Sequence, residues 1–246
     1  MIRFRDIIHC IFPYGIFRIK SGLSAEGGLS AQRSNSETVQ QRSGLTAQRS
    51  GDKVAYLTFD DGPIPEVTPK VLDILARYDV KATFFMVGEN IDKHPEVFRQ
   101  VVEAGHSVGN HTYNHLKGWN YSLNDYLENV QKWEETAKNK SSIFNLQSSI
   151  FNLFRPPYGK ATFSQRRALH KLGYRIVYWD ILTRDYNAQR TPEQMLRLIQ
   201  RDVRNGSIIN FHDSLKSNER MLTVLPQAIE WLQAQGYELR QLTING

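Results

Sequence analysis

The chain has 246 residues, of which 40% are hydrophobic, and its mean hydropathy is −0.48. These values predict a soluble globular protein, and no stretch is apolar enough to predict a membrane span. The net charge is +6, but residues 1–52 carry half of it, with seven Lys/Arg and four Asp/Glu. The remainder is nearly balanced, which excludes a dedicated nucleic-acid surface. The single cysteine, Cys10, excludes an intrachain disulfide.

The N-terminal fifth of the chain divides into two segments of different character. Residues 1–20 have basic residues followed by an apolar run, but Asp6, His9 and Pro13 interrupt the pattern of a secretion signal. We expect this segment to pack on the domain or to contact a membrane surface peripherally, in a protein that is cytoplasmic or membrane-associated rather than secreted. Residues 21–52 are rich in Ser, Gly and Gln and predict a low-complexity linker or insertion.

From Lys53 onward, strand-like and helix-like segments alternate, which predicts one α/β domain over residues 53–246. Its expected architecture is a distorted (β/α) barrel of about seven parallel strands. The expected strands and closing segment cover 54–59, 82–87, 107–112, 153–155, 175–179, 206–211 and 237–242. The expected helices cover 67–78, 95–104, 123–138, 163–172, 191–204 and 221–235. A tandem repeat at 141–154, SSIFNLQ followed by SSIFNLF, predicts a lengthened connection without a chemical role.

Titratable residues stand at or just past the ends of five expected strands. They are Asp60 and Asp61, His111 and His115, Arg155, Asp180 and Asp185, and His212 and Asp213. The carboxyl ends of barrel strands share one rim, and that rim carries the chemistry in barrel enzymes. The pattern therefore predicts an active site built from several strand ends.

Two of these groups predict a metal site. His111 and His115 are four residues apart, so both rings would lie on one side if the chain turned helically there. Two imidazoles and one carboxylate are typical of catalytic zinc and suit other transition metals. Because adjacent side chains diverge, one of Asp60 and Asp61 is expected to bind the metal and the other to accept a proton. The alternatives are acids that cap a turn and histidines without a ligand role.

The remaining groups suggest partners for that chemistry. Arg155 begins the rigid segment Arg-Pro-Pro-Tyr-Gly, and a guanidinium near the acids would lower the pKa of the base. A backbone N–H in this turn could also face a developing oxyanion. His212 ends an apolar strand, and a histidine held by a carboxylate is a natural general acid. The alternatives are a structural arginine beneath a proline turn and a histidine that caps a loop.

Five ordered motifs, TFDDGP, NHTYNH, RPPYG, the WD…RDY stretch and INFHD, resemble those of the polysaccharide deacetylases, also called the NodB homology domain or carbohydrate esterase family four. The resemblance covers residues 53–246. It implies a distorted barrel with a divalent metal, usually zinc, with cobalt or another transition metal as alternatives. It also implies a glycan partner, with removal of N-acetyl groups from N-acetylglucosamine-containing glycans such as peptidoglycan or chitin. We expect a monomer.

Position by position, the resemblance implies a role for each motif residue. It implies a metal triad of Asp61, His111 and His115. It implies that Asp60 is the base, that Arg155 tunes it, that the Tyr158 N–H binds the oxyanion, that His212 is the acid, and that Asp185 orients His212. It implies that the substrate pocket includes Pro156, Tyr186 and Phe211.

Two positions depart from the usual family pattern. Tyr186 stands where a tryptophan is usual, and Phe211 stands where a leucine is usual. Both replacements keep apolar bulk, so they bear on substrate preference rather than on activity. The rival functions are an O-acetyl esterase acting on acetylated xylan and a catalytically silent glycan-binding barrel.

Overall fold

The computed structural model describes residues 15–16, 53–143 and 152–243. The predicted linker at 21–52 lies outside the described residues, as does the predicted N-terminal segment 1–20 apart from Gly15 and Ile16. The tandem repeat at 141–154 is described only at its two ends. No helix in the described ranges combines the length and the apolar character needed to cross a membrane.

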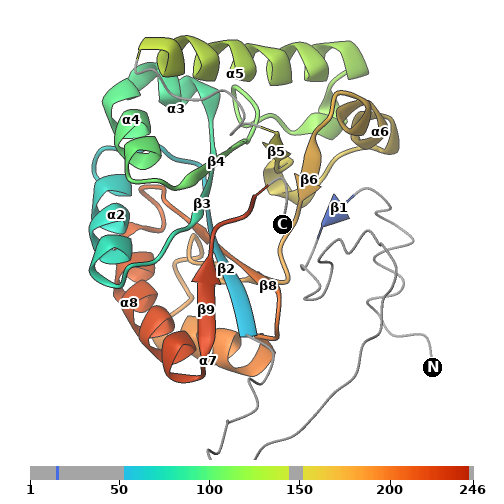
Figure 1. Cartoon of the computed structure of the whole chain (residues 1–246). Coiled ribbons are helices and arrows are strands. Elements are labelled where there is room, and N and C mark those ends of the chain that lie inside the picture. Colours follow the sequence, from blue (N-terminus) through green and yellow to red (C-terminus); the bar gives the residue numbers. More distant parts are fainter. Residues whose placement is uncertain (1–14, 17–52, 144–151, 244–246) are drawn as a thin grey trace, which may run out of the picture.

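A parallel sheet forms the centre of the domain (Figure 1). Its strands are β1 (Gly15–Ile16), β2 (Lys53–Asp60), β3 (Thr83–Met86), β4 (Ser107–Asn110), β5 (Leu153–Phe154), β6 (Arg175–Val177), β7 (Ile181–Leu182), β8 (Ser207–His212) and β9 (Tyr237–Arg240). The order is β1-β6-β5-β4-β3-β2-β8-β7, with β9 beside the first half of β2. From β6 to β7, seven parallel strands curl into a half-barrel, which confirms the predicted distorted barrel.

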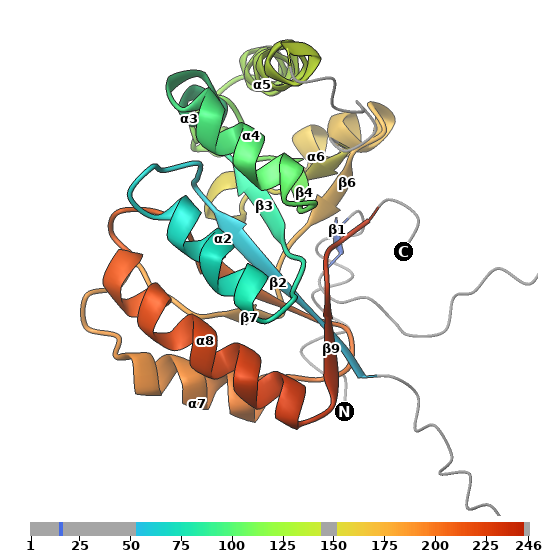
Figure 2. The same cartoon turned by 60° about the vertical axis from the view of Figure 1, so that its left-hand side comes forward.

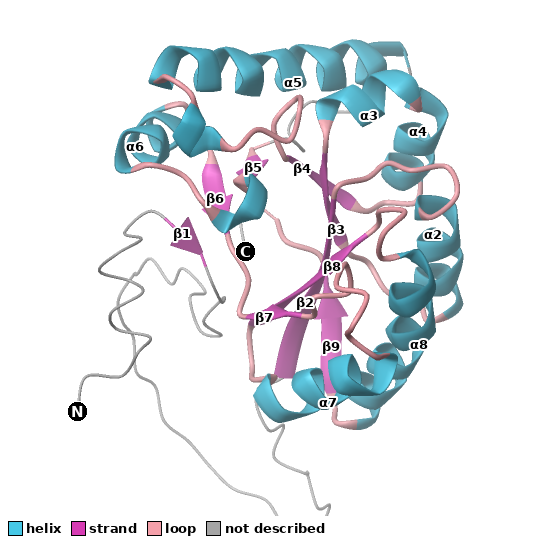
Figure 3. Cartoon of the chain, turned by 180° about the vertical axis from the view of Figure 1, so that it is seen from behind, coloured by secondary structure: helices cyan, strands magenta, loops and turns pink. Residues whose placement is uncertain are grey.

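Seven described helices lie outside this sheet. They are α2 (Thr68–Arg77), α3 (Gly88–Lys93), α4 (Pro95–Glu103), α5 (Leu123–Ile143), α6 (Phe163–Lys171), α7 (Pro192–Asp202) and α8 (Asn218–Ala234). Helices α2, α4, α7 and α8 lie along one flank of the strands, whereas α5 and α6 lie beside β4, β5 and β6 (Figures 2 and 3). The sequence did not predict α3 or β7, because six and two residues are too short to show a period.

The predicted helix starts at α6 and α7 are confirmed by their caps. Thr162 accepts a hydrogen bond from the Gln165 backbone, and the Gln165 side chain accepts one from the Thr162 backbone. Thr191 and Gln194 form the same capping box at α7. Each box satisfies two backbone N–H groups that the first helical turn leaves without partners.

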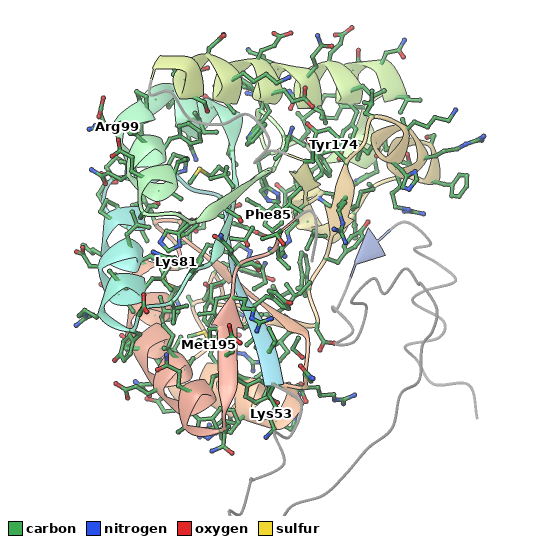
Figure 4. The ribbon with its side chains drawn as sticks, in the orientation of Figure 1. Lys53, Lys81, Phe85, Arg99, Tyr174 and Met195 are labelled. Atoms are coloured by element: carbon green, nitrogen blue, oxygen red, sulfur yellow. The ribbon has the colours of Figure 1, made fainter. Side chains whose placement is uncertain are left out.

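Alternation along the strands separates two cores. Side chains at every second position, including Phe59, Phe84 and Phe211, point to the large core between strands and helices. The other positions point into the barrel, where a smaller core includes Phe85; Figure 4 shows Phe85 among the strands. On β2 the inward series runs from Val54 and Tyr56 to Thr58 and Asp60, so on this strand the inward-facing polar groups lie near the carboxyl end.

We predict that Phe59→Ala destabilises the domain by about 3–5 kcal/mol, because it leaves a cavity in a packed core. The Phe59 ring is fully buried, and its centroid lies 5.0 Å from that of Phe84 and 5.8 Å from that of Phe211. Urea unfolding measures the change. The control Leu172→Ala, at a side chain that is 62% exposed, should alter stability by less than about 0.5 kcal/mol. Equal losses in both variants would contradict the packing.

Candidate active site

A cavity of 740 Å³ opens at the carboxyl ends of the strands. Seven of the residues predicted from sequence line it: Asp60, Asp61, His111, His115, Tyr158, Tyr186 and His212. They come from the ends of β2, β4, β5, β7 and β8, or from the loops that follow them. The structure therefore brings together side chains that are up to about 150 positions apart in the sequence.

Asp61, His111 and His115 form a cluster that fits a divalent metal. Their ligand atoms all lie within 4.8 Å of one another. The Asp61 Oδ1 atom lies 3.8 Å from His111 Nε2 and 3.3 Å from His115 Nε2, is buried, and accepts no hydrogen bond. A buried carboxylate oxygen without a partner is costly, and a cation would satisfy it.

The state of His111 supports the same interpretation. Burial lowers the pKa of His111 to about 4, so the imidazole is neutral at pH 7. Its Nδ1 atom lies 2.7 Å from the Arg155 carbonyl oxygen, to which the ring can donate. This bond leaves the Nε2 lone pair directed at Asp61, as a metal-binding histidine requires.

The expected helical turn between the two histidines is wrong. Residues 111–117 form an irregular loop in which Thr112 and His115 have positive φ, of 65° and 54°. Asn110 shapes this loop by accepting a hydrogen bond from the Thr112 N–H at 2.8 Å. The loop, rather than helical spacing, places the His111 and His115 rings 5.0 Å apart.

Asp60 is a buried carboxylate held by Arg155. Its Oδ1 accepts from Arg155 Nη1 at 2.7 Å, and its Oδ2 accepts from Asn210 Nδ2 at 2.9 Å. Burial alone would raise the pKa of Asp60, but the charge of Arg155, the charge of His212 and the hydrogen bond from Arg155 outweigh burial and lower it. Asp60 is therefore an ionised group that faces the cavity beside the metal cluster.

Sequence reasoning missed Asn210 and Thr58, which complete this arrangement. The Arg155 Nη1 atom also donates to Asn210 Oδ1 at 2.6 Å and to Thr58 Oγ1 at 2.9 Å. Thr58 stands two positions before Asp60, and Asn210 stands two positions before His212. Thr58 and Asn210 are also direct partners in the pairing of β2 with β8. The period of two in strands was the signal that would have placed them inside the barrel.

Asp185 forms two hydrogen bonds with His212, which lines the cavity. Its Oδ1 lies 2.8 Å from His212 Nδ1, and its Oδ2 accepts from the His212 backbone N–H at 2.7 Å. Burial lowers the pKa of His212, but the hydrogen bond and charge of Asp185, with the charges of Asp61 and Asp60, outweigh it and raise the value to about 9. His212 is therefore protonated at pH 7.

Asp213, the carboxylate adjacent to His212 in sequence, contacts a different element. Its Oδ1 accepts from the Gly62 N–H at 3.0 Å, and its Oδ2 accepts from Thr68 Oγ1 at 2.6 Å. A Cβ atom added to Gly62 would lie 2.0 Å from Asp213 Oδ2. Because Gly62 has no side chain, Asp213 can approach the turn that directly follows Asp61 and hold it through these hydrogen bonds.

Three predicted positions need correction. Asp180 is not at the rim: it accepts a hydrogen bond from Ser207, at the start of β8 and hence at the opposite end of the barrel. Phe211 does not line the cavity, because alternation on β8 turns its ring away from His212 toward Phe59. Pro156 is buried before a 3₁₀ turn and does not line the cavity either.

Tyr158 and Tyr186 both border the cavity. The ring of Tyr186 meets that of His212 edge-on, with centroids 4.9 Å apart. Tyr158 lies in the 3₁₀ turn η3 (Pro157–Gly159) with φ of 59°. Within the described part of the chain, its backbone N–H donates to no protein acceptor and is available to a ligand.

We predict that Gly62→Ala weakens metal binding by about 10–100-fold, because the new Cβ must displace Asp213 and with it the turn that carries Asp61. Calorimetric titration of the metal-free protein with Zn²⁺ measures this effect. Gly173→Ala is the control: its positive φ of 87° makes the alanine locally strained, but no atom lies within 4 Å of an added Cβ and Gly173 does not line the cavity. An unchanged zinc affinity in Gly62→Ala would contradict the role of the Asp213–Gly62 contact in positioning Asp61.

Comparison with known proteins shows the family of the chain. Residues 47–177 match the family profile described as polysaccharide deacetylase. The chain is 32% identical to a peptidoglycan-N-acetylglucosamine deacetylase of Bacillus cereus, over 76% of this chain and 85% of the relative. It is also 32% identical to a chitooligosaccharide deacetylase of Azorhizobium caulinodans, over 76% of this chain and 91% of the relative.

A solved structure shows the same fold. The crystal structure of a peptidoglycan N-acetylglucosamine deacetylase in complex with an N-hydroxybenzamide compound superposes with a TM-score of 0.72 at 30% identity, covering 77% of this chain and 86% of that one. The chain belongs to the polysaccharide deacetylase family, the NodB or carbohydrate esterase family four enzymes.

Proposed function

We propose that the protein is a metal-dependent hydrolase that removes N-acetyl groups from N-acetylglucosamine-containing glycans and releases acetate. The observation that carries the proposal is one cavity lined by the Asp61–His111–His115 cluster, an ionised Asp60 and a protonated His212. A base and an acid whose environments push their pKa values apart are suited to hydrolysis. The names of the relatives, which specify N-acetylglucosamine and chitooligosaccharides, support the same substrate class.

Asp61, His111 and His115 would hold the metal. Two imidazoles and a carboxylate favour zinc, with cobalt or another transition metal as alternatives. When bound, such an ion polarises the acetyl carbonyl and lowers the pKa of water.

Asp60 would accept the proton of the attacking water. The Arg155 and Asn210 hydrogen bonds hold its carboxylate in one orientation and keep it ionised. The bond that forms joins the water oxygen to the acetyl carbon. The Tyr158 N–H would donate to the carbonyl oxygen as negative charge develops there.

His212 would donate its proton to the sugar nitrogen as the carbon–nitrogen bond breaks. Asp185 fixes the ring through Nδ1 and leaves Nε2 for the cavity. The products are acetate and a free amine on the sugar. Tyr186 packs against His212 and borders the space that the acetyl group would occupy.

Around this chemistry we propose a monomer with its catalytic domain at residues 53–246. The linker at 21–52, and the packing or membrane contact of residues 1–20, complete the proposed organisation. The native glycan is a peptidoglycan, a chitin-like polymer or another polysaccharide that contains N-acetylglucosamine.

Acetate release tests the proposal. Oligomers of N-acetylglucosamine and acetylated xylan are each incubated with the enzyme, with added zinc or cobalt and with a chelator. We expect release from the N-acetyl oligomers that the chelator abolishes. Release from xylan alone would contradict the proposal in favour of an O-acetyl esterase, and release from neither would favour a silent glycan-binding barrel.

We predict that Asp60→Asn and His111→Ala fail for different reasons. Asp60→Asn should lose about 10²–10⁴-fold in kcat but keep its zinc, because it removes the base and no ligand. His111→Ala should lose zinc affinity by more than about 100-fold, because it removes a ligand. Zinc content after dialysis and acetate release are measured in both. Normal zinc content in both variants would overturn the ligand assignment.

We predict that Asp185→Asn moves the alkaline limb of the kcat/KM profile to lower pH. His212 acts in its protonated form, so activity falls as pH rises through its raised pKa. The charge and hydrogen bond of Asp185 raise that pKa against burial, and the amide removes the charge. An alkaline limb that stays in place would show that another group titrates there. Zinc content serves as the control and should not change.

A further inference from the structure

Two loops beside the cavity place lysines over each other's aromatic rings. The first follows His115 and contains Lys117 and Trp119; the second contains Tyr158 and Lys160. The Lys117 Nζ atom lies 5.7 Å from the Tyr158 ring centroid, and the Lys160 Nζ atom lies 5.3 Å from that of Trp119. The two rings meet edge-on, with centroids 5.7 Å apart. We call these four side chains the lysine–aromatic platform.

The platform continues the wall of the cavity outward. Tyr158 lines the cavity, and its ring centroid lies 4.7 Å from that of His115. Trp119 is 42% exposed and Tyr158 is 50% exposed. A sugar polymer with one residue at the metal cluster would therefore meet these rings with the next residue along the chain.

Buried contacts hold both loops in place. The buried Gln165 donates through Nε2 to the Gly118 carbonyl at 2.8 Å and so fixes the loop that carries Trp119. Gly159 packs closely against Trp179: a Cβ atom added to Gly159 would lie only 2.6 Å from the tryptophan ring. The platform is thus built on two anchored loops, and little ordering would be needed for it to bind a ligand.

The charge of the platform is uncompensated. Among the described residues, neither the Lys117 nor the Lys160 ammonium forms an ion pair or a hydrogen bond. Aromatic faces contact the apolar face of any sugar ring, but two free ammonium groups discriminate by charge. We propose that this platform binds the sugar adjacent to the reacting N-acetylglucosamine and selects glycans in which that sugar bears a carboxylate, as N-acetylmuramic acid does.

This proposal rests on the proposed function, and it decides between peptidoglycan and chitin-like polymers as the substrate class. In an alternating polymer of N-acetylglucosamine and N-acetylmuramic acid, each lactyl group that carries no peptide presents one carboxylate beside the reacting sugar. A chitin-type oligomer presents none. The selection is therefore expected in KM rather than in kcat, because the ammonium groups lie outside the reacting centre.

The test compares acetate release from two tetrasaccharides: the acidic alternating one and neutral tetra-N-acetylchitotetraose. In Lys117→Gln/Lys160→Gln, kcat/KM for the acidic tetrasaccharide should fall about tenfold through KM, because two exposed charge contacts are lost. The value for the neutral one should stay within about twofold. About 1 M sodium chloride should remove the difference in the unaltered enzyme. Trp119→Ala should raise KM for both.

Lys53→Gln is the matched control. Its Nζ atom also lies over a tyrosine ring, 5.5 Å from the Tyr237 centroid, but at the start of β2 and so at the opposite end of the barrel. It should leave both substrates unchanged. Equal losses on both tetrasaccharides in the double variant, or no preference for the acidic one in the unaltered enzyme, would overturn the proposal.

A binding measurement separates this proposal from the proposed function. Calorimetry with zinc-loaded Asp60→Asn measures the affinity for each tetrasaccharide without turnover. Tighter binding of the acidic one, lost when Lys117→Gln and Lys160→Gln are added, supports the platform even if the unaltered enzyme releases no acetate. Acetate release with equal binding of the two overturns the platform and leaves the proposed function standing.

Discussion

The buried ion pair between Arg155 and Asp60 is the interaction on which the rest of the site depends. Both side chains are almost fully inaccessible, and the Nη1–Oδ1 distance is 2.7 Å. A buried charge is tolerated only when it is paired and its remaining hydrogen-bonding groups are satisfied. Arg155 meets this condition by donating to the Val177 and Tyr178 carbonyls as well as to Asn210 and Thr58. Its partners come from β2, β8 and the segment that leaves β6, so one guanidinium joins both sides of the half-barrel.

That arrangement determines the chemistry of the neighbouring groups. Because Arg155 outweighs the effect of burial, Asp60 is a base rather than a neutral acid. The Arg155 carbonyl also accepts from His111 and so directs the histidine toward Asp61. One residue therefore sets the charge of the base through its side chain and the orientation of a metal-cluster histidine through its backbone. The neighbouring strand β8 repeats the arrangement with reversed charge: His212, which pairs with Asp60 in the sheet, is kept protonated by Asp185.

The substrate side of the cavity follows a different rule. Its aromatic and lysine side chains are exposed, lie on loops, and depend for their positions on the buried Gln165 and the partly buried Trp179. Charge at exposed positions acts weakly and is screened by salt, so it can rank substrates without contributing to the bond-breaking step. The residues proposed to carry the reaction lie at the strand ends, whereas the residues proposed to distinguish glycans lie on the loops beyond them.

The sequence by itself determined the barrel, its longer strands and helices to within a few residues, and the motif residues at the rim. The short elements β1, α3 and β7 were not predicted. It could do so because periodicity, capping boxes and strand-end polar residues are local signals. Only the tertiary structure decided which way each side chain points. It turned Phe211 to the outer core and Asn210 to Asp60, placed Asp180 at the far end, and replaced the expected helical turn with an irregular loop at His111 and His115. It also showed that Asp213 accepts a hydrogen bond from the Gly62 N–H. Lys117 and Lys160 each lie over an aromatic ring of the other loop. Alternation along β8 shows only that Asn210 and Phe211 face opposite sides of the sheet. Which side is the inside, and how the loops run, is fixed by contacts between residues distant in sequence.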